Sequence, residues 1–181
     1  MINKFLIVFF CLFYSCDNNQ YINTYKLPKT NSVSINRSST EDINKKTPFS
    51  WDIPAKWNES NKSSMRLASF SASYIGGLAD ISITSFSGQG GGILANVNRW
   101  RKQLGLNPAS LNQINNSIVM KKSELGNYKL IKIINEKEPS SAFLCSIIEI
   151  KNSTVFVKMN ASVNGIDQLE KEFIAFCSSF K

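Results

Sequence analysis

The chain has 181 residues, a formal net charge of +8 and no histidine. Without an imidazole, serine–histidine and cysteine–histidine nucleophiles and histidine-ligated zinc are excluded. The 13 aspartates and glutamates are scattered and include no DxD or ExxE pair, so we predict no catalytic residue, no metal site and no cofactor. The lysine excess forms no stripe with interleaved aromatic residues, so we expect no nucleic-acid partner.

The first 15 residues are typical of a secretion signal. Lys4 precedes an apolar run over residues 5–14, which is shorter than the roughly 20 residues that a membrane-spanning helix needs. The run ends in LFYSC, which resembles a bacterial lipobox, although Phe13 stands where leucine is usual. We expect lipidation of Cys16 and, through this anchor, attachment to a membrane of the bacterial cell envelope. Ordinary secretion is the alternative.

Residues 16–47 are rich in Asn, Ser, Thr and Lys. Such a segment buries too little apolar surface to offset the entropy cost of ordering it, so we interpret it as the flexible tether of the lipidated chain. The remaining residues, 48–181, have the usual length of one domain with one core.

The domain is predicted to begin with strands. Residues 49–53 are strand-like and end at Pro54. Residues 65–73 and 78–86 alternate apolar and polar side chains on either side of a glycine pair, a pattern that predicts a β-hairpin. On the second of these strands, one side is polar and is expected to be less deeply covered; its residues are Asp80, Ser82 and Thr84.

Helices and four further strands are expected after the hairpin. A helix is predicted over residues 93–104, and Asn107-Pro108 is expected to begin a shorter helix that reaches about Ile114. Strands are predicted at 118–122, 128–134, 142–150 and 154–159, and a core-packing helix at 166–180. The third of these strands is apolar on both faces, which favours an interior place in the sheet. This order predicts an α+β fold with a mostly antiparallel sheet flanked by helices.

Two cysteines fall in these last elements. Cys145 belongs to the apolar strand and Cys177 to the apolar face of the last helix. We interpret both as buried free thiols, with one disulfide between them as the alternative.

The order of elements over residues 49–180 resembles the PsbP-like α/β/α sandwich. The strongest part of this resemblance is the ending TVFVKMNASVNGIDQLEKEFIAFCSSF. The segments WDIPAKW, SMRLASF and GGGILANVNRWRKQLGL are similar to parts of uncharacterised bacterial envelope proteins. PsbP-like domains are mostly non-catalytic and bind other proteins, so the resemblance implies a binding role.

A glycine-rich loop, residues 88–92, precedes the first helix. It matches neither the Walker pattern, because no lysine and hydroxyl follow Gly92, nor the dinucleotide pattern. Two interpretations stay open: free N–H groups at the start of the helix could hold an anion, or the glycines only let the backbone turn close to the sheet.

The first helix has an apolar stripe that contains Val97 and Trp100, bordered by amides and arginines. One border carries Asn96, Arg99 and Gln103, and the other carries Asn98 and Arg101. These side chains form either a recognition surface or structural hydrogen bonds to nearby loops.

The leading hypothesis is a lipid-anchored, non-enzymatic binding module of the cell envelope that recognises a protein partner. The predicted recognition residues are Arg66, Gly90, Gly91, Gly92, Asn96, Arg99 and Gln103. An enzyme or binding protein for an anionic small molecule, using the 88–92 loop with Arg99 or Arg101, is one alternative. A structural envelope protein without a discrete site is another.

Overall fold

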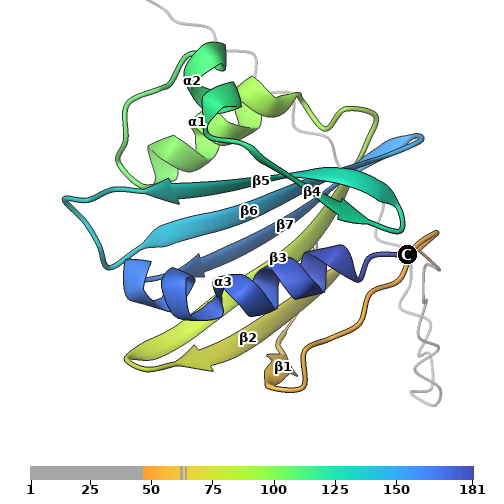
Figure 1. The fold of residues 1–181 in the computed structure, drawn as a ribbon, viewed down its shortest axis with the longest axis horizontal. Coiled ribbons are helices and arrows are strands. Elements are labelled where there is room, and N and C mark those ends of the chain that lie inside the picture. Colours follow the sequence, from red (N-terminus) through yellow and green to blue (C-terminus); the bar gives the residue numbers. More distant parts are fainter. Residues whose placement is uncertain (1–46, 62, 64) are drawn as a thin grey trace, which may run out of the picture. The chain divides into compact units, whose positions relative to one another are not determined.

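A computed structural model describes residues 47–61, 63 and 65–181 (Figure 1). The predicted secretion signal, the lipidation site Cys16 and almost all of the predicted tether lie outside these residues. Within the described part, seven strands form one antiparallel sheet in the order β1-β2-β3-β7-β6-β5-β4. The strands are β1 (Trp57–Glu59), β2 (Ala68–Tyr74), β3 (Gly77–Ser87), β4 (Val119–Ser123), β5 (Gly126–Ile134), β6 (Ala142–Ile150) and β7 (Ser153–Ala161).

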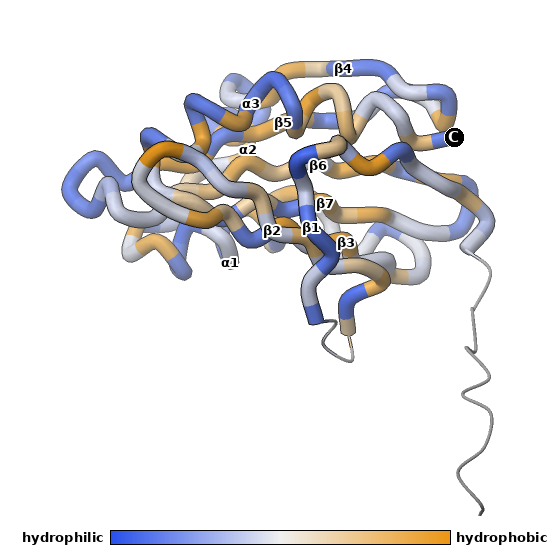
Figure 2. Tube along the Cα trace, turned by 90° about the horizontal axis from the view of Figure 1, so that it is seen from below, coloured by the Kyte–Doolittle hydropathy of each residue, from blue (hydrophilic) through white to orange (hydrophobic). Residues whose placement is uncertain are grey.

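Helices cover both faces of the sheet, which confirms the predicted α+β class. They are α1 (Ile93–Gln103), α2 (Leu111–Asn116) and α3 (Val163–Ser178). Figure 1 shows α1 and α2 on one side of the sheet and α3 on the other. The predicted hairpin of β2 and β3 is confirmed, and so is the interior position of β6, which is apolar along most of its length (Figure 2).

The last helix, α3, packs the larger core against the sheet. Its apolar residues recur at helical spacing, so Ile166, Phe173 and Phe176 all face the strands and are at most 1% exposed. Burying each of these side chains stabilises the fold by about 1.5–3 kcal/mol. Residue 165 in the first turn is a glycine, and a Cβ at this position would be 2.6 Å from the ring of Tyr74.

The helices α1 and α2 pack a second, smaller core on the opposite face. Val97 and Trp100 of α1 meet Cys145 and Phe156 of the sheet. Ser110 caps α2, with its side chain accepting from the N–H of Gln113 in a capping box. The prediction that Asn107-Pro108 begins this helix is therefore wrong, because the residue that supplies the cap comes later.

The start of the domain differs from the predicted strand at residues 49–53. The rings of Phe49 and Trp51 stack on Phe180, and the backbone of Ser50 exchanges two hydrogen bonds with that of Lys181. The first strand of the sheet is instead β1, which pairs with β2. This segment clasps the carboxyl end of the chain.

The two cysteines are buried and unpaired, and they lie on opposite sides of the sheet. Cys145 belongs to the core under α1, whereas Cys177 lies on α3 in the other core. Burial raises the pKa of both thiols. The sheet between them rules out a bridge, so the free-thiol interpretation is confirmed.

Among the helices in the described part of the chain, none has the length and apolar character of a membrane span.

Candidate functional site

The layer formed by α1 and α2 covers only half of its face of the sheet. The buried strand residues beneath it all belong to β5, β6 and β7. On β2 and β3 the same face carries mostly polar side chains, because their apolar neighbours in sequence point toward α3, although Phe86 near the end of β3 packs against Phe156. These polar residues are Ser69, Ser71, Asp80, Ser82 and Thr84. Asp80 and Thr84 are partly exposed, as predicted, but Ser82 is buried.

Arg66 lies over this polar half-face and is paired with a carboxylate. Its two terminal nitrogens donate to the two carboxylate oxygens of Asp80 at 2.8 and 2.9 Å. The hydrogen bond to Asp80 raises the pKa of Arg66. The side chains are 29% and 46% exposed, so the pair is a neutral unit at the surface.

Lys158 lies on β7 between the polar half-face and α1. Its Nζ is 4.3 Å from the centroid of the Phe143 ring and donates to Oε1 of Gln103 at 3.2 Å. Burial lowers the pKa of Lys158, and the nearby positive charges of Arg66 and Arg99 lower it further. Sequence analysis did not assign Lys158 to the site. The available signal was a lysine in an apolar strand that shares a face with Phe156 under the helix.

Asn96 holds the glycine loop against the start of α1. Its Nδ2 donates to the carbonyls of Gly90 at 2.8 Å and Gly92 at 2.7 Å, and its Oδ1 accepts from Arg99 at 2.7 Å. Asn96 is only 2% exposed. It therefore does not lie on the surface border where the helical spacing placed it, because the loop folds over it.

Backbone conformation and close packing explain why glycine occupies these loop positions. Gly90 has a φ of +57°, and a Cβ there would be 2.8 Å from the ring of Phe156. Gly91 and Gly92 also have positive φ values. The N–H groups of Gly88 and Gly92 donate to backbone carbonyls. These contacts fit a tight turn packed on the sheet.

Arg99 and Gln103 remain on the α1 border, together with Lys158. Both α1 residues are exposed, and Arg99 donates a hydrogen bond to Asn96, which holds the loop. Neither Arg99 nor Lys158 has a carboxylate within salt-bridge distance among the described residues. We call Arg66, Arg99, Gln103 and Lys158 the basic border.

The opposite border of α1 faces α2. Asn98 exchanges two hydrogen bonds with the backbone of Ala109, and Nε of Arg101 donates to the carbonyl of Asn107 at 2.8 Å. Arg101 is therefore not brought to the glycine loop or to Arg99, because a separation of two residues places them on different sides of the helix. An anion site that combines the loop with Arg101 therefore lacks a geometric basis, whereas Arg99 stays next to the loop through Asn96.

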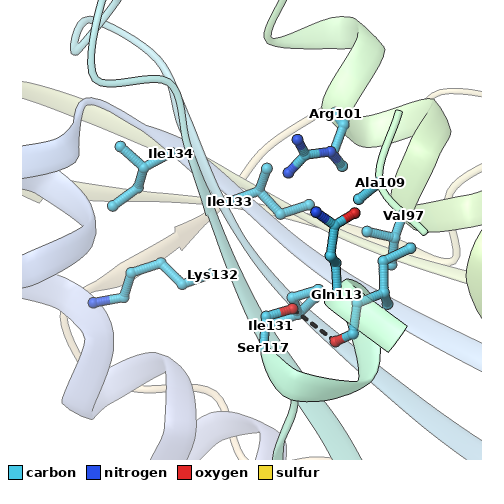
Figure 3. Close-up of a pocket in the computed structure, with 10 residues that line it drawn as sticks. Val97, Arg101, Ala109, Gln113, Ser117, Ile131, Lys132, Ile133 and Ile134 are labelled. Atoms are coloured by element: carbon cyan, nitrogen blue, oxygen red, sulfur yellow. Dashed lines mark hydrogen bonds between the residues drawn. The ribbon is translucent and has the colours of Figure 1, made fainter. Parts of the chain in front are cut away.

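A cavity that sequence analysis did not predict lies beside Arg101, between α1, α2 and β5 (Figure 3). Its volume is about 370 Å³. It is lined by Val97, Arg101, Ala109, Gln113, Ile114, Ser117 and the four β5 residues 131–134. Because these residues come from three separate parts of the chain, no local sequence pattern indicates the cavity.

Within the part of the chain that the structure describes, no three Cys, Asp or Glu side chains gather to hold a metal ion.

Comparisons with known proteins place the fold among distant structures only. No protein-family model matches the chain, and no curated protein matches it. One similar solved structure is a protein of Bacteroides thetaiotaomicron, 16% identical over 74% of this chain and 44% of that chain, with a TM-score of 0.47. Another is the cyanobacterial PsbP, CyanoP, of Synechocystis, 12% identical over 74% of this chain and 85% of that chain, also with a TM-score of 0.47. The chain thus spans less than half the length of the Bacteroides protein.

Proposed function

We propose that this protein is a non-enzymatic binding module of the bacterial cell envelope. A lipid on Cys16 would anchor it to a membrane, and the basic border would recognise a protein partner. The partner surface that suits this border is acidic and rich in hydrogen-bond acceptors.

One observation carries the proposal: a partly exposed polar half-face of the sheet lies beside cations that have no carboxylate within salt-bridge distance among the described residues. Arg66 and Asp80 neutralise each other. Arg99 and Lys158 then leave an excess of positive charge along the α1 border. An acidic partner would meet complementary charge there, which favours fast and specific association. Arginine is among the residue types that most often dominate binding energy at interfaces.

A substituted full chain tests this proposal in affinity capture from the native envelope. The substitution Arg99→Glu reverses one charge of the basic border at an exposed position. The matched control is Lys171→Glu, which makes the same charge change at an exposed position of α3 on the other face. We expect a partner that wild type and Lys171→Glu capture equally and that Arg99→Glu loses.

Thermal unfolding distinguishes binding from folding in this experiment. Exposed substitutions away from structural features usually change stability by less than about 0.5 kcal/mol. Capture that Arg99→Glu leaves unchanged, or that falls only in proportion to the folded fraction, contradicts the proposal.

A further inference from the structure

We propose that a second binding site, separate from the basic border, lies where the cavity beside Arg101 meets an open edge of β5. Its ligand is an extended peptide of a partner protein, with an apolar side chain next to a carboxylate. The peptide would add to the sheet as a strand, place the apolar side chain in the cavity and direct the carboxylate at Arg101.

The open edge results from the different lengths of the strands that pair with β5. The outer strand, β4, pairs only with Gly126 to Leu130, whereas β6 pairs as far as Ile134. Residues 131–134 therefore have a neighbouring strand on one side only within the described part of the chain. Backbone groups of an antiparallel strand alternate between its two sides, so about half of the N–H and C=O groups of these residues point to the open side. Such groups are a template for an added strand.

The cavity and the open edge involve the same four residues of β5, 131–134. Figure 3 shows Ile131 and Ile133 directed toward α1 and α2, while Lys132 and Ile134 point away from them. Nζ of Lys132 donates to Glu170 of α3 at 2.6 Å, on the other face of the sheet. Lys132 and Ile134 therefore border the cavity through their backbone, within the same segment of β5 that β4 leaves without an outer strand.

The cavity has a mixed lining, in which four aliphatic side chains lie beneath polar groups that include Arg101 and Gln113. Val97, Ile114, Ile131 and Ile133 are each at most 3% exposed and line it from three elements. Its volume of about 370 Å³ lies at the lower end of the range in which ligand cavities of proteins fall. An aliphatic or aromatic side chain of a bound peptide would gain burial there.

Two hydrogen-bond donors define the polar end of the ligand. Nε of Arg101 is used by Asn107, but the terminal guanidinium nitrogens of Arg101 have no acceptor among the described residues. Oε1 of Gln113 accepts from the N–H and the hydroxyl of Ser110, which leaves the amide nitrogen free to donate. Among the described residues, no carboxylate lines the cavity. A peptide carboxylate would therefore meet a charged donor and a neutral donor at the mouth.

Panning a phage-displayed library of random short peptides on the full chain tests this site. We expect enrichment of peptides that alternate apolar and polar residues and carry an acidic residue beside an apolar one. Binding of the resynthesised peptides is then measured by fluorescence polarisation. Arg101→Gln should weaken it by about tenfold or more, since a charge-assisted hydrogen bond is lost. Lys102→Gln, the same charge change at the next exposed residue, is the matched control and should leave it unchanged.

Two further changes separate strand addition from occupation of the cavity alone. Ala109→Phe fills the cavity from the α1–α2 loop and should abolish binding, with the fold checked by circular dichroism. Methylation of the peptide amides on one alternating set of residues should abolish binding, and methylation of the other set should not, because only one set faces β5.

Several results would overturn the proposal. These are a library without enrichment, peptides that bind Arg101→Gln or Ala109→Phe as tightly as wild type, and binding that tolerates methylation of both sets. Self-association of the chain that Ala109→Phe abolishes would show that a second copy occupies the edge, which also excludes the peptide.

Discussion

The substitution Asn96→Ala tests whether the polar side chains of α1 serve structural hydrogen bonding or recognition of a partner. The change removes the amide that joins α1 to the carbonyls of Gly90 and Gly92, without adding bulk. It also removes the acceptor of Arg99. Because Asn96 is 2% exposed, water does not replace these contacts without a rearrangement of the loop.

The expected loss follows from the number of hydrogen bonds and their burial. Each net intramolecular hydrogen bond contributes about 0.5–1.5 kcal/mol, so loss of the two that hold the loop should cost about 1–3 kcal/mol. Gly92 keeps one donor, the N–H of residue 96, whereas the carbonyl of Gly90 loses its side-chain donor. For a domain of this size we expect the melting temperature to fall by roughly 4 °C for each kcal/mol.

Urea denaturation and thermal melts of the full chain measure this loss. Asn112→Ala is the matched control, because Asn112 is exposed on α2, and it should stay within about 0.5 kcal/mol of wild type. If Asn96→Ala is as stable as wild type yet loses the captured partner, the hydrogen bonds do not hold the loop and Asn96 acts in recognition. That result would refute our reasoning about α1.

Three further predictions address the loop, Lys158 and the anchor. Gly90→Ala should destabilise the protein by about 1–3 kcal/mol more than Gly88→Ala. Both positions have a positive φ, but only at Gly90 does an added Cβ collide with Phe156. Equal losses of stability in urea denaturation would contradict this. Burial lowers the pKa of Lys158, so as the pH rises the folded state loses this proton before the unfolded state does. The stability of wild type relative to Lys158→Met should therefore increase as the pH rises toward the ordinary lysine pKa of 10.5. A flat difference across stepped alkaline pH would show that Lys158 is well solvated. Cys16→Ser should abolish partitioning of the mature protein into a detergent phase, whereas persistent partitioning would exclude the lipid anchor.

Elements with a strong sequence period were predictable, because burial of one face dictates both the period and the structure. The alternation around Gly76-Gly77 gave the hairpin of β2 and β3, and the spacing of Phe173 and Phe176 gave α3. The strand β1 has only three residues, which is too short to show an alternation of apolar and polar side chains, and it is defined by its pairing with β2. Residues 49–53 are apolar for a different reason, since their aromatic rings stack on Phe180.

The site was less predictable because it depends on contacts between distant segments. Helical spacing correctly grouped Arg99 with Gln103 on one border of α1, but it gave no information about the loop that buries Asn96. The pairing of Arg66 with Asp80 required the register of the hairpin. The open edge of β5 results from the point at which β4 stops, which no property of β5 itself indicates.

The backbone hydrogen bonds between Ser50 and Lys181 hold the first described residues of the domain beside its last ones. The backbone N–H of Leu125, just before β5, bonds to the carbonyl of Phe180, so β5 begins beside the point where the chain enters the domain. It then runs away for nine residues, Gly126–Ile134, which spans roughly 30 Å. A force applied at Ser50 would act at this end of β5, whereas residues 131–134, which pair with β6 alone among the described strands, lie at the opposite end. The length of β5 therefore separates residues 131–134 from the contact between Ser50 and Lys181.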